Sequence, residues 1–217
     1  MDKPIETYWD LNLRDLKQQL TKNGFDVYMV DSANAAKNVV MDEILPEIQP
    51  KSVSWGGSMT LAATGLYELL RDSDEYEALD TWDKTLSNDE KTELRRQALL
   101  VDCFFCSTNA VTEEGHLVNL DMIGNRTGAI TFGPKNVVIL VSRNKLVPDL
   151  QRAMDRIKEY VAPVNTMRLD MKTPCVKTGY CMDCDSPQRI CNVWTITERS
   201  FPKGRIKVVL INDDLGF

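Results

Sequence analysis

The hydrophobic pattern alternates between helical and extended segments over most of the chain. From Glu6 to Lys22 apolar residues recur every three or four positions, which predicts an amphipathic helix. Short apolar runs bounded by glycine or polar turn residues follow, and these are typical of strands. We expect strands at residues 25–30, 52–55, 76–81, 100–106, 116–120, 129–132 and 136–142, and further helices at 32–45, 59–70, 88–100 and 147–160.

This alternation favours an α/β fold with a doubly wound, mostly parallel sheet. The run LVDCFFC at 100–106 is almost continuously apolar, as expected of a buried parallel strand. After Ala162 the alternation stops, and a cysteine-rich loop at 174–191 precedes two strands, at 193–199 and 205–211. We expect these two strands to pair like a hairpin and to close an edge of the sheet.

Composition and charge narrow the class of protein. The chain has 27% charged and 43% hydrophobic residues, as ordinary soluble proteins have, and no linker or repeat divides it, so we expect one domain over 1–217. Its net charge of −6 argues against nucleic acid as a partner. We find no signal-peptide pattern near the N-terminus, and the longest apolar run, Val137–Val141, is too short for a membrane span. We therefore expect a cytoplasmic protein.

The carboxyl ends of the predicted strands suggest a ligand site, because open α/β sheets bind ligands there. The strand at 52–55 runs into Gly56, Gly57 and Ser58, and the following helix would point free N–H groups at an anion. The alternative is a tight strand–helix turn without a ligand. Loops near other strand ends add further anion-binding candidates: Asn125, Arg126, Arg143 and Lys145.

Two carboxylates are candidates for catalysis. Glu113 and Glu114 stand in the stretch TEEG, which we expect near the same sheet edge. Either could serve as a general base or a nucleophile if a pocket tunes its pKa. Either could equally be a solvated loop charge. Arg126 could hold a substrate carboxylate or phosphate beside them through two parallel hydrogen bonds.

The stretch PCVKTGYCMDCDSPQRIC holds four of the six cysteines, namely Cys175, Cys181, Cys184 and Cys191. In a cytosolic protein such a group indicates metal binding or catalysis more often than disulfides. Four thiolates suit tetrahedral zinc or an iron–sulfur cluster such as [4Fe–4S]. There is a single C-x2-C pair and the other spacings are irregular, which favours the cluster; zinc or no metal are the alternatives. Lys172, Lys177 and Arg189 would offset the cluster's negative charge.

The remaining two cysteines have a different environment. Cys103 and Cys106 also have C-x2-C spacing, but they lie in the apolar run at 100–106. Residues three apart on a strand face opposite sides of the sheet. We therefore expect two buried core thiols there.

Three segments together resemble the lactate-utilization (LUD) domain family. They are SWGGSMTL, TEEGHLVNLDMIGNRTGAITFGPKNVVILVSRNKLVPDLQRAM and KTPCVKTGYCMDCDSPQRICN, and the resemblance extends from about Leu11 to the stretch INDDLGF. The family's fold is similar to that of ribose-5-phosphate isomerase, glucosamine-6-phosphate deaminase and the class I CoA transferases (NagB/RpiA/CoA-transferase-like). The resemblance thus implies the same doubly wound sheet and an anion at Gly56–Ser58.

Some LUD members belong to a multi-subunit iron–sulfur system that oxidises L-lactate to pyruvate, and not every member carries the cysteines. The resemblance therefore implies a cysteine-bearing oxidoreductase component with a small anionic ligand, a carboxylate or phosphate, and a redox partner protein. Glu113-Glu114-Gly115 is similar to the Glu-x-Gly turn of CoA transferases, which implies an alternative non-redox enzyme with Glu113 as nucleophile. A third alternative is a zinc-stabilised, non-catalytic assembly subunit. In each of these three alternatives the protein could form a homo-oligomer.

Overall fold

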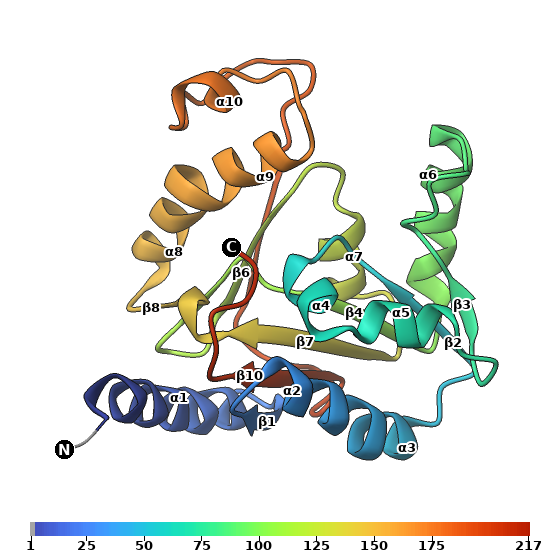
Figure 1. Ribbon diagram of the computed structural model, residues 1–217, viewed down its shortest axis with the longest axis vertical. Coiled ribbons are helices and arrows are strands. Elements are labelled where there is room, and N and C mark those ends of the chain that lie inside the picture. The colour runs from blue at the N-terminus through green and yellow to red at the C-terminus, as the bar shows by residue number, and fades with distance from the viewer. Residues whose placement is uncertain (1–2) are drawn as a thin grey trace.

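A computed structural model describes residues 3–217 (Figure 1). Its centre is a six-stranded sheet in which every neighbouring pair is parallel, in the order β1-β10-β7-β4-β2-β3. The strands are β1 (Asp26–Val30), β2 (Ser52–Trp55), β3 (Glu77–Leu79), β4 (Cys103–Ser107), β7 (Asn136–Ser142) and β10 (Ile206–Ile211). The predicted α/β fold with a mostly parallel sheet is confirmed.

Helices cover both faces of this sheet, as the pattern of apolar residues predicts. The helices up to β7 are α1 (Pro4–Lys22), α2 (Ala33–Val39), α3 (Leu45–Ile48), α4 (Met59–Thr64), α5 (Leu66–Arg71), α6 (Asn88–Gln97) and α7 (Asn125–Thr131). A π-helical turn joins α2 to α3, and Gly65 separates α4 from α5. One apolar cluster includes α1 and α7, and a second includes α2, α4 and α5.

The buried strands contribute to both clusters by alternation. Phe104 and Cys106 of β4 belong to the cluster with α1, whereas Cys103 and Phe105 belong to the cluster with α2. Cys103 and Cys106 are both wholly buried and both carry free thiols. The prediction of two core thiols on opposite faces is therefore confirmed.

A second, four-stranded sheet stands beside the carboxyl ends of the central one, in the order β8-β5-β6-β9. Its strands are β5 (Ala110–Thr112), β6 (Leu117–Asp121), β8 (Leu146–Val147) and β9 (Val193–Thr197). The helices α8 (Leu150–Arg156) and α9 (Ala162–Arg168), joined by a π-helical turn, lead away from it to the short helix α10 (Cys175–Thr178) (Figure 1). Ala153 and Ile157 pack against β5 and β6 in a third apolar cluster.

The predicted hairpin of the last two strands is wrong. β9 pairs antiparallel with β6 in the second sheet, whereas β10 lies between β1 and β7 in the central one. All six residues of β10 are buried, because this strand is apolar on both faces and packs helices on each. A strand of this kind belongs in the interior of a parallel sheet.

The predicted strand at 129–132 is also wrong. Residues 129–131 complete the helix α7, which begins after Gly124 in a left-handed conformation with φ of 80°. Four apolar residues are too few to distinguish a strand from a buried helical turn. Among the helices described between residues 3 and 217, none has the length and apolar character needed to cross a membrane.

Two isoleucines test the placement of the last strands. Ile211 in β10 is fully buried, whereas Ile196 in β9 is 40% exposed. We expect Ile211→Ala to lower the free energy of unfolding by about 2–5 kcal/mol, because it removes core contacts and leaves a cavity. Ile196→Ala should cost less than about 1 kcal/mol. Urea denaturation measures both, and equal losses would contradict the central position of β10.

Candidate functional sites

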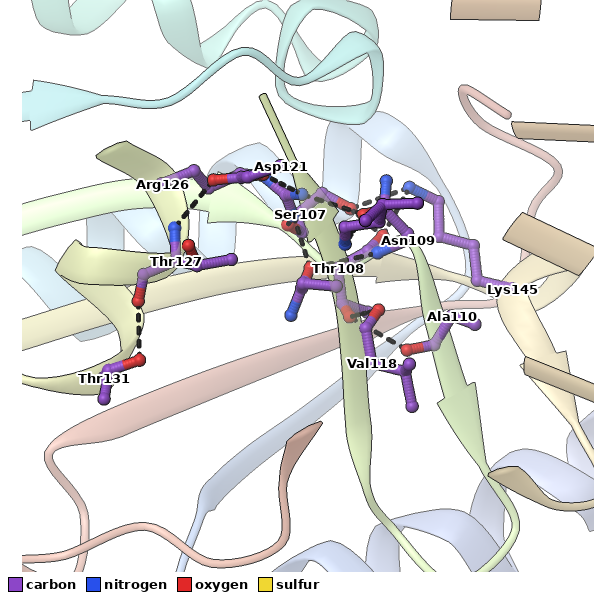
Figure 2. A network of polar contacts seen from close by, with 12 residues as sticks. Ser107, Thr108, Asn109, Ala110, Val118, Asp121, Arg126, Thr127, Thr131 and Lys145 are labelled. Atoms are coloured by element: carbon purple, nitrogen blue, oxygen red, sulfur yellow. Dashed lines mark hydrogen bonds and ion pairs between the residues drawn. The ribbon is translucent and has the colours of Figure 1, made fainter. Parts of the chain in front are cut away.

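Buried polar side chains gather where β4 and β7 end and the second sheet begins (Figure 2). We call this group the carboxyl-edge cluster; it consists of Ser107, Asn109, Asn119, Asp121, Arg126 and Lys145. Ser107 is the last residue of β4, and Lys145 stands in the turn after β7. Neighbouring parallel strands end at the same edge, which brings these two residues together. Asn119 and Asp121 come from β6, and Arg126 comes from α7.

Arg126 is the centre of this cluster and is 7% exposed. Its Nε and Nη2 donate to Asp121 Oδ1 at 3.1 and 2.6 Å. Its Nη1 donates to the Ser107 carbonyl at 2.7 Å and to Asn119 Oδ1, and its Nη2 donates to Asn109 Oδ1 at 2.8 Å. All five N–H groups of the guanidinium therefore have partners within the protein. We therefore interpret Arg126 as an anchor that joins the two sheets, and not as a side chain whose N–H groups are open to a ligand.

The Gly56–Ser58 turn contacts the same arginine. A Cβ on Gly56 would lie 3.1–3.3 Å from three side-chain carbons of Arg126, so any larger residue here would push the arginine side chain away. Ser58 caps α4, because its Oγ accepts a hydrogen bond from the Leu61 N–H at 3.0 Å. A Cβ on Gly57, in contrast, would meet no atom within 4 Å. Gly57 is thus the residue of this turn that faces open space.

Lys145 is buried beside Arg126 and is 4% exposed. Its Nζ donates to Ser107 Oγ at 2.7 Å and to the Thr108 carbonyl at 3.2 Å. The pKa of Lys145 is lowered to about 7, because burial disfavours the charged amine and because Arg156 and Arg126 repel it. Near neutral pH this amine can therefore gain or lose a proton.

Arg156 of α8 also belongs to this region, and sequence reasoning missed it. Its guanidinium donates to the backbone carbonyls of Asn109 and Asn144, at 2.8–3.2 Å. Burial lowers its pKa, and its guanidinium lies 5.8 Å from the ring centre of Tyr160. An arginine within an amphipathic helical pattern normally marks the solvated face, so the sequence carried no signal for this one.

Two other anion-binding candidates take different positions. Arg143 follows β7 but points to Asp214, to which Nε and Nη2 donate at 3.0 and 3.1 Å, and it also lies over the ring of Trp9. The Asp214 side chain is 58% exposed, so this ion pair is open to solvent. Asn125 is the half-buried first residue of α7. The structure thus brings Gly56, Arg126 and Lys145 together and leaves Arg143 in a separate ion pair.

Glu113 and Glu114 lie in the turn between β5 and β6, at the opposite end of this hairpin from Asn109 and Asn119. Both side chains are exposed. The turn packs against the end of α1, where Asn23 Nδ2 donates to the Glu114 carbonyl at 2.8 Å. The structure therefore does not bring the two candidate catalytic carboxylates to the carboxyl-edge cluster.

The cysteine-rich loop forms a second candidate site, next to α9 and away from the central sheet (Figure 1). Its four cysteines line a single, partly open pocket with a cavity volume of about 20 Å³. The four are Cys175, Cys181, Cys184 and Cys191, and each carries a free thiol. Ala162 and Pro163 from α9 form the apolar wall. We call this space the cysteine pocket.

Hydrogen-bonding groups surround two of the sulfur atoms. Cys175 Sγ lies 3.3 Å from Thr166 Oγ1 and 3.2 Å from Thr173 Oγ1. The Asp183 N–H donates to Cys181 Sγ at 3.4 Å. Hydroxyl and amide donors at this range stabilise negative charge on sulfur. The Asp183 N–H is thus a donor that suits a thiolate, whereas the Thr166 hydroxyl donates to the Pro163 carbonyl at 2.7 Å and leaves its oxygen to face Cys175.

Basic side chains hold the loop in place. Arg189 donates to the carbonyls of Cys184 and Cys191 at 2.6 and 2.9 Å, and it shares the Asp183 carboxylate with Lys158. Lys158 and Arg189 together lower the pKa of Asp183. Of the other two predicted cations, Lys172 pairs with Asp170 and Lys177 is exposed on α10.

The donor set of the cysteine pocket fits an iron–sulfur cluster by its chemistry: four thiols, an N–H donor to sulfur and two cations. A mononuclear zinc site needs all four sulfurs about 2.3 Å from one point. Within residues 3–217, no three His, Cys, Asp or Glu side chains are gathered closely enough to hold a metal ion.

The lowered pKa of Lys145 predicts how the free energy of unfolding depends on pH. Its pKa is lower in the folded chain, about 7, than the ordinary 10.5, so the unfolded state binds more protons between these values. The free energy of unfolding should therefore rise with pH in this window, by up to about 1.4 kcal/mol per pH unit from this group. Lys145→Met should be more stable than the parent near pH 7, and this difference should shrink as pH rises. Urea denaturation across this range measures it, and a constant difference would contradict the lowered pKa.

The ion pair between Arg126 and Asp121 leads to a second prediction, about the free energy of unfolding. Asp121→Asn leaves the buried Arg126 without its countercharge and should lower the free energy of unfolding by about 3–5 kcal/mol. Asp214→Asn is the matched control, because it breaks the exposed pair with Arg143 and should cost at most about 1 kcal/mol. Thermal or urea denaturation compares the two. A loss for Asp121→Asn no larger than that of the control would mean that Arg126 does not depend on this carboxylate.

Comparison with known proteins now identifies the family. The family model described as LUD domain matches residues 13–211. The crystal structure of a DUF162 family protein from Deinococcus radiodurans is similar in fold, with a TM-score of 0.53 and 12% sequence identity, covering 94% of this chain and 98% of that one. A comparison with curated proteins gives no match. The chain belongs to the LUD domain family.

Proposed function

We propose that this LUD-domain protein is an iron–sulfur-linked component of an oxidoreductase that also binds a small anionic ligand. The observation that carries the proposal is that all four cysteines of the loop line one pocket, beside Lys158 and Arg189. Four free thiols that line one pocket are the type of ligand set that metal and iron–sulfur sites use. The anionic ligand belongs to the carboxyl-edge cluster, where buried cations gather.

The residues of the cysteine pocket have separate tasks in this proposal. The four cysteines are the ligands, and the cluster, when bound, supplies a one-electron redox centre. The Asp183 N–H donates to Cys181 Sγ and thereby favours the more negative, reduced state, and the hydroxyls of Thr166 and Thr173 lie within hydrogen-bond distance of Cys175 Sγ. Arg189 fixes the loop through two cysteine carbonyls and contributes a positive charge.

The surroundings of the pocket suit contact with a redox partner protein. The pocket lies at the periphery of the molecule, beside α9 and α10 (Figure 1). Tyr180 and Met182, on the loop that forms it, are 58% and 54% exposed. Exposed aromatic residues and methionine are enriched where proteins meet. A partner protein that docks here would lie next to the redox centre of the cysteine pocket.

The geometry gives less support to the alternative of a CoA-transferase-like or sugar-phosphate-isomerase-like enzyme. That alternative needs Glu113 or Glu114 in the ligand pocket. Both side chains are exposed, and their turn packs on α1 instead of on the carboxyl-edge cluster. We therefore put forward the redox function alone.

The test is metal analysis of protein purified without oxygen. We expect a brown protein that contains iron and acid-labile sulfide. The double variant Cys181→Ser/Cys184→Ser should lose both, because it removes two of four ligands. The matched control Cys103→Ala changes a cysteine buried in β4, far from the loop in the fold, and should keep them. A colourless protein with zinc or no metal would contradict the proposal, and so would iron that persists in the double variant.

A further inference from the structure

Two cations of the carboxyl-edge cluster, Arg126 and Lys145, lie near a third, Arg156 of α8, and among residues 3–217 a single carboxylate pairs with the three. Arg126 pairs with Asp121. Lys145 bonds only to a hydroxyl and a carbonyl, and Arg156 bonds only to carbonyls. In the part of the chain that the structure describes, neither Lys145 nor Arg156 has an ion pair. Buried charges are normally paired, so this region carries positive charge that the protein does not neutralise.

A buried hydrogen-bond donor in the same cluster also has no partner. Asn119 is fully buried, and its Oδ1 accepts from Arg126 and from the Asn109 N–H. Its Nδ2, in contrast, donates to no atom of residues 3–217. An amide donor left unpaired in the interior costs free energy, and each such group calls for an explanation. An oxygen atom of a ligand would satisfy it.

We propose that Lys145 and Arg156 form a binding site for a small oxyanion, a short carboxylate or a phosphate group, which binds together with a proton taken up by Lys145. The inference rests on the anion-binding part of the proposed function and names the residues and the proton that it involves. The anion supplies the negative charge that the two cations lack. Asn119 Nδ2 is a further donor of the same cluster.

The entrance to this site lies on the side of α8. Arg156 and Asn109 are half-buried, and Tyr160, against which the Arg156 guanidinium lies, is 50% exposed. Lys145 and Ser107, 4% and 5% exposed, stand behind them. Arg156 is therefore the first cation that an anion meets from solvent, and Lys145 is the innermost.

Proton uptake follows from the groups that face Lys145. These are Arg156 on α8, Arg126 on α7 and the Cys106 thiol on β4, with the Asp121 carboxylate of β6 bound to Arg126. Burial and the two guanidiniums oppose the charged amine, and within the described part of the chain no carboxylate pairs with it. A bound anion reverses this balance and holds Lys145 in its charged form. Above neutral pH the free protein must therefore take up a proton when the anion binds.

Titration calorimetry with pyruvate and with inorganic phosphate tests this proposal. At pH 8 we expect a binding enthalpy that depends on the ionisation enthalpy of the buffer, which reveals the proton. The apparent Kd for pyruvate, which does not titrate in this range, should rise about tenfold per pH unit above the pKa of Lys145. The two ligands distinguish a carboxylate site from a phosphate site.

Matched variants locate the site. Lys145→Met should weaken binding at least about tenfold and remove the proton uptake. Arg156→Gln should weaken binding and reduce the uptake without abolishing it, because it removes one of the two guanidiniums that oppose the charged amine. Lys207→Met is the control, since Lys207 is an equally buried lysine at the opposite edge of the sheet, 3.7 Å from Asp26. It should leave anion binding unchanged. If Lys145→Met fails to fold, Arg156→Gln and the pH profile of the parent still decide the question.

Several results would overturn the proposal. They are no binding of either anion to the parent protein, unchanged binding in Lys145→Met or Arg156→Gln, and an affinity for pyruvate that does not change with pH. The double variant Cys181→Ser/Cys184→Ser should bind the anion as the parent does. Failure of the iron–sulfur proposal would thus appear in metal content alone, and failure of this one in anion binding alone.

Discussion

The buried ion pair between Arg126 and Asp121 connects the parts of this protein. Asp121 ends β6 of the second sheet, and it also accepts the Thr127 N–H in the first turn of α7. Arg126 reaches from α7 to the last residue of β4 and passes over Gly56 at the end of β2. Two sheets and one helix thus share a single guanidinium. Removing one partner of such a pair is costly, because the other charge stays buried.

This pair also determines the electrostatics of its neighbours. Because Asp121 is occupied by Arg126, its charge is not available to Lys145 or Arg156. The positive charge of Lys145 and Arg156 therefore stays unpaired. Unpaired buried cations destabilise a protein, so stability alone does not explain these two residues. Proteins accept such costs most often at functional sites. The structural anchor and the proposed anion site are therefore two consequences of one distribution of charge.

The cysteine pocket is built on different physical principles. It uses a loop fixed by Arg189 and by the wall of α9, and none of its four thiols belongs to the central sheet. Its position at the periphery separates it from the carboxyl-edge cluster in the fold (Figure 1). The LUD domain thus provides a scaffold with two chemically distinct candidate sites, one rich in sulfur and one rich in buried positive charge.

Much of this architecture was predictable from local pattern. β2 and β7 begin and end where apolar runs begin and end, and the cysteines were recognisable by spacing alone. The partner of a strand is not a local property, and so β10 was misplaced although its residues were recognised as extended. The roles of Arg126 and Arg156 depend on which oxygens surround them after folding. Sequence reasoning could name Arg126 as a candidate, but not that its five donors are engaged within the protein.

The central claim is that the cysteine pocket holds a redox-active cluster. Low-temperature electron paramagnetic resonance of protein isolated without oxygen and reduced with dithionite tests it most directly. The account predicts a signal from a reduced iron–sulfur cluster that disappears on reoxidation and returns on renewed reduction. A sample that stays silent in both states and contains no iron would contradict it.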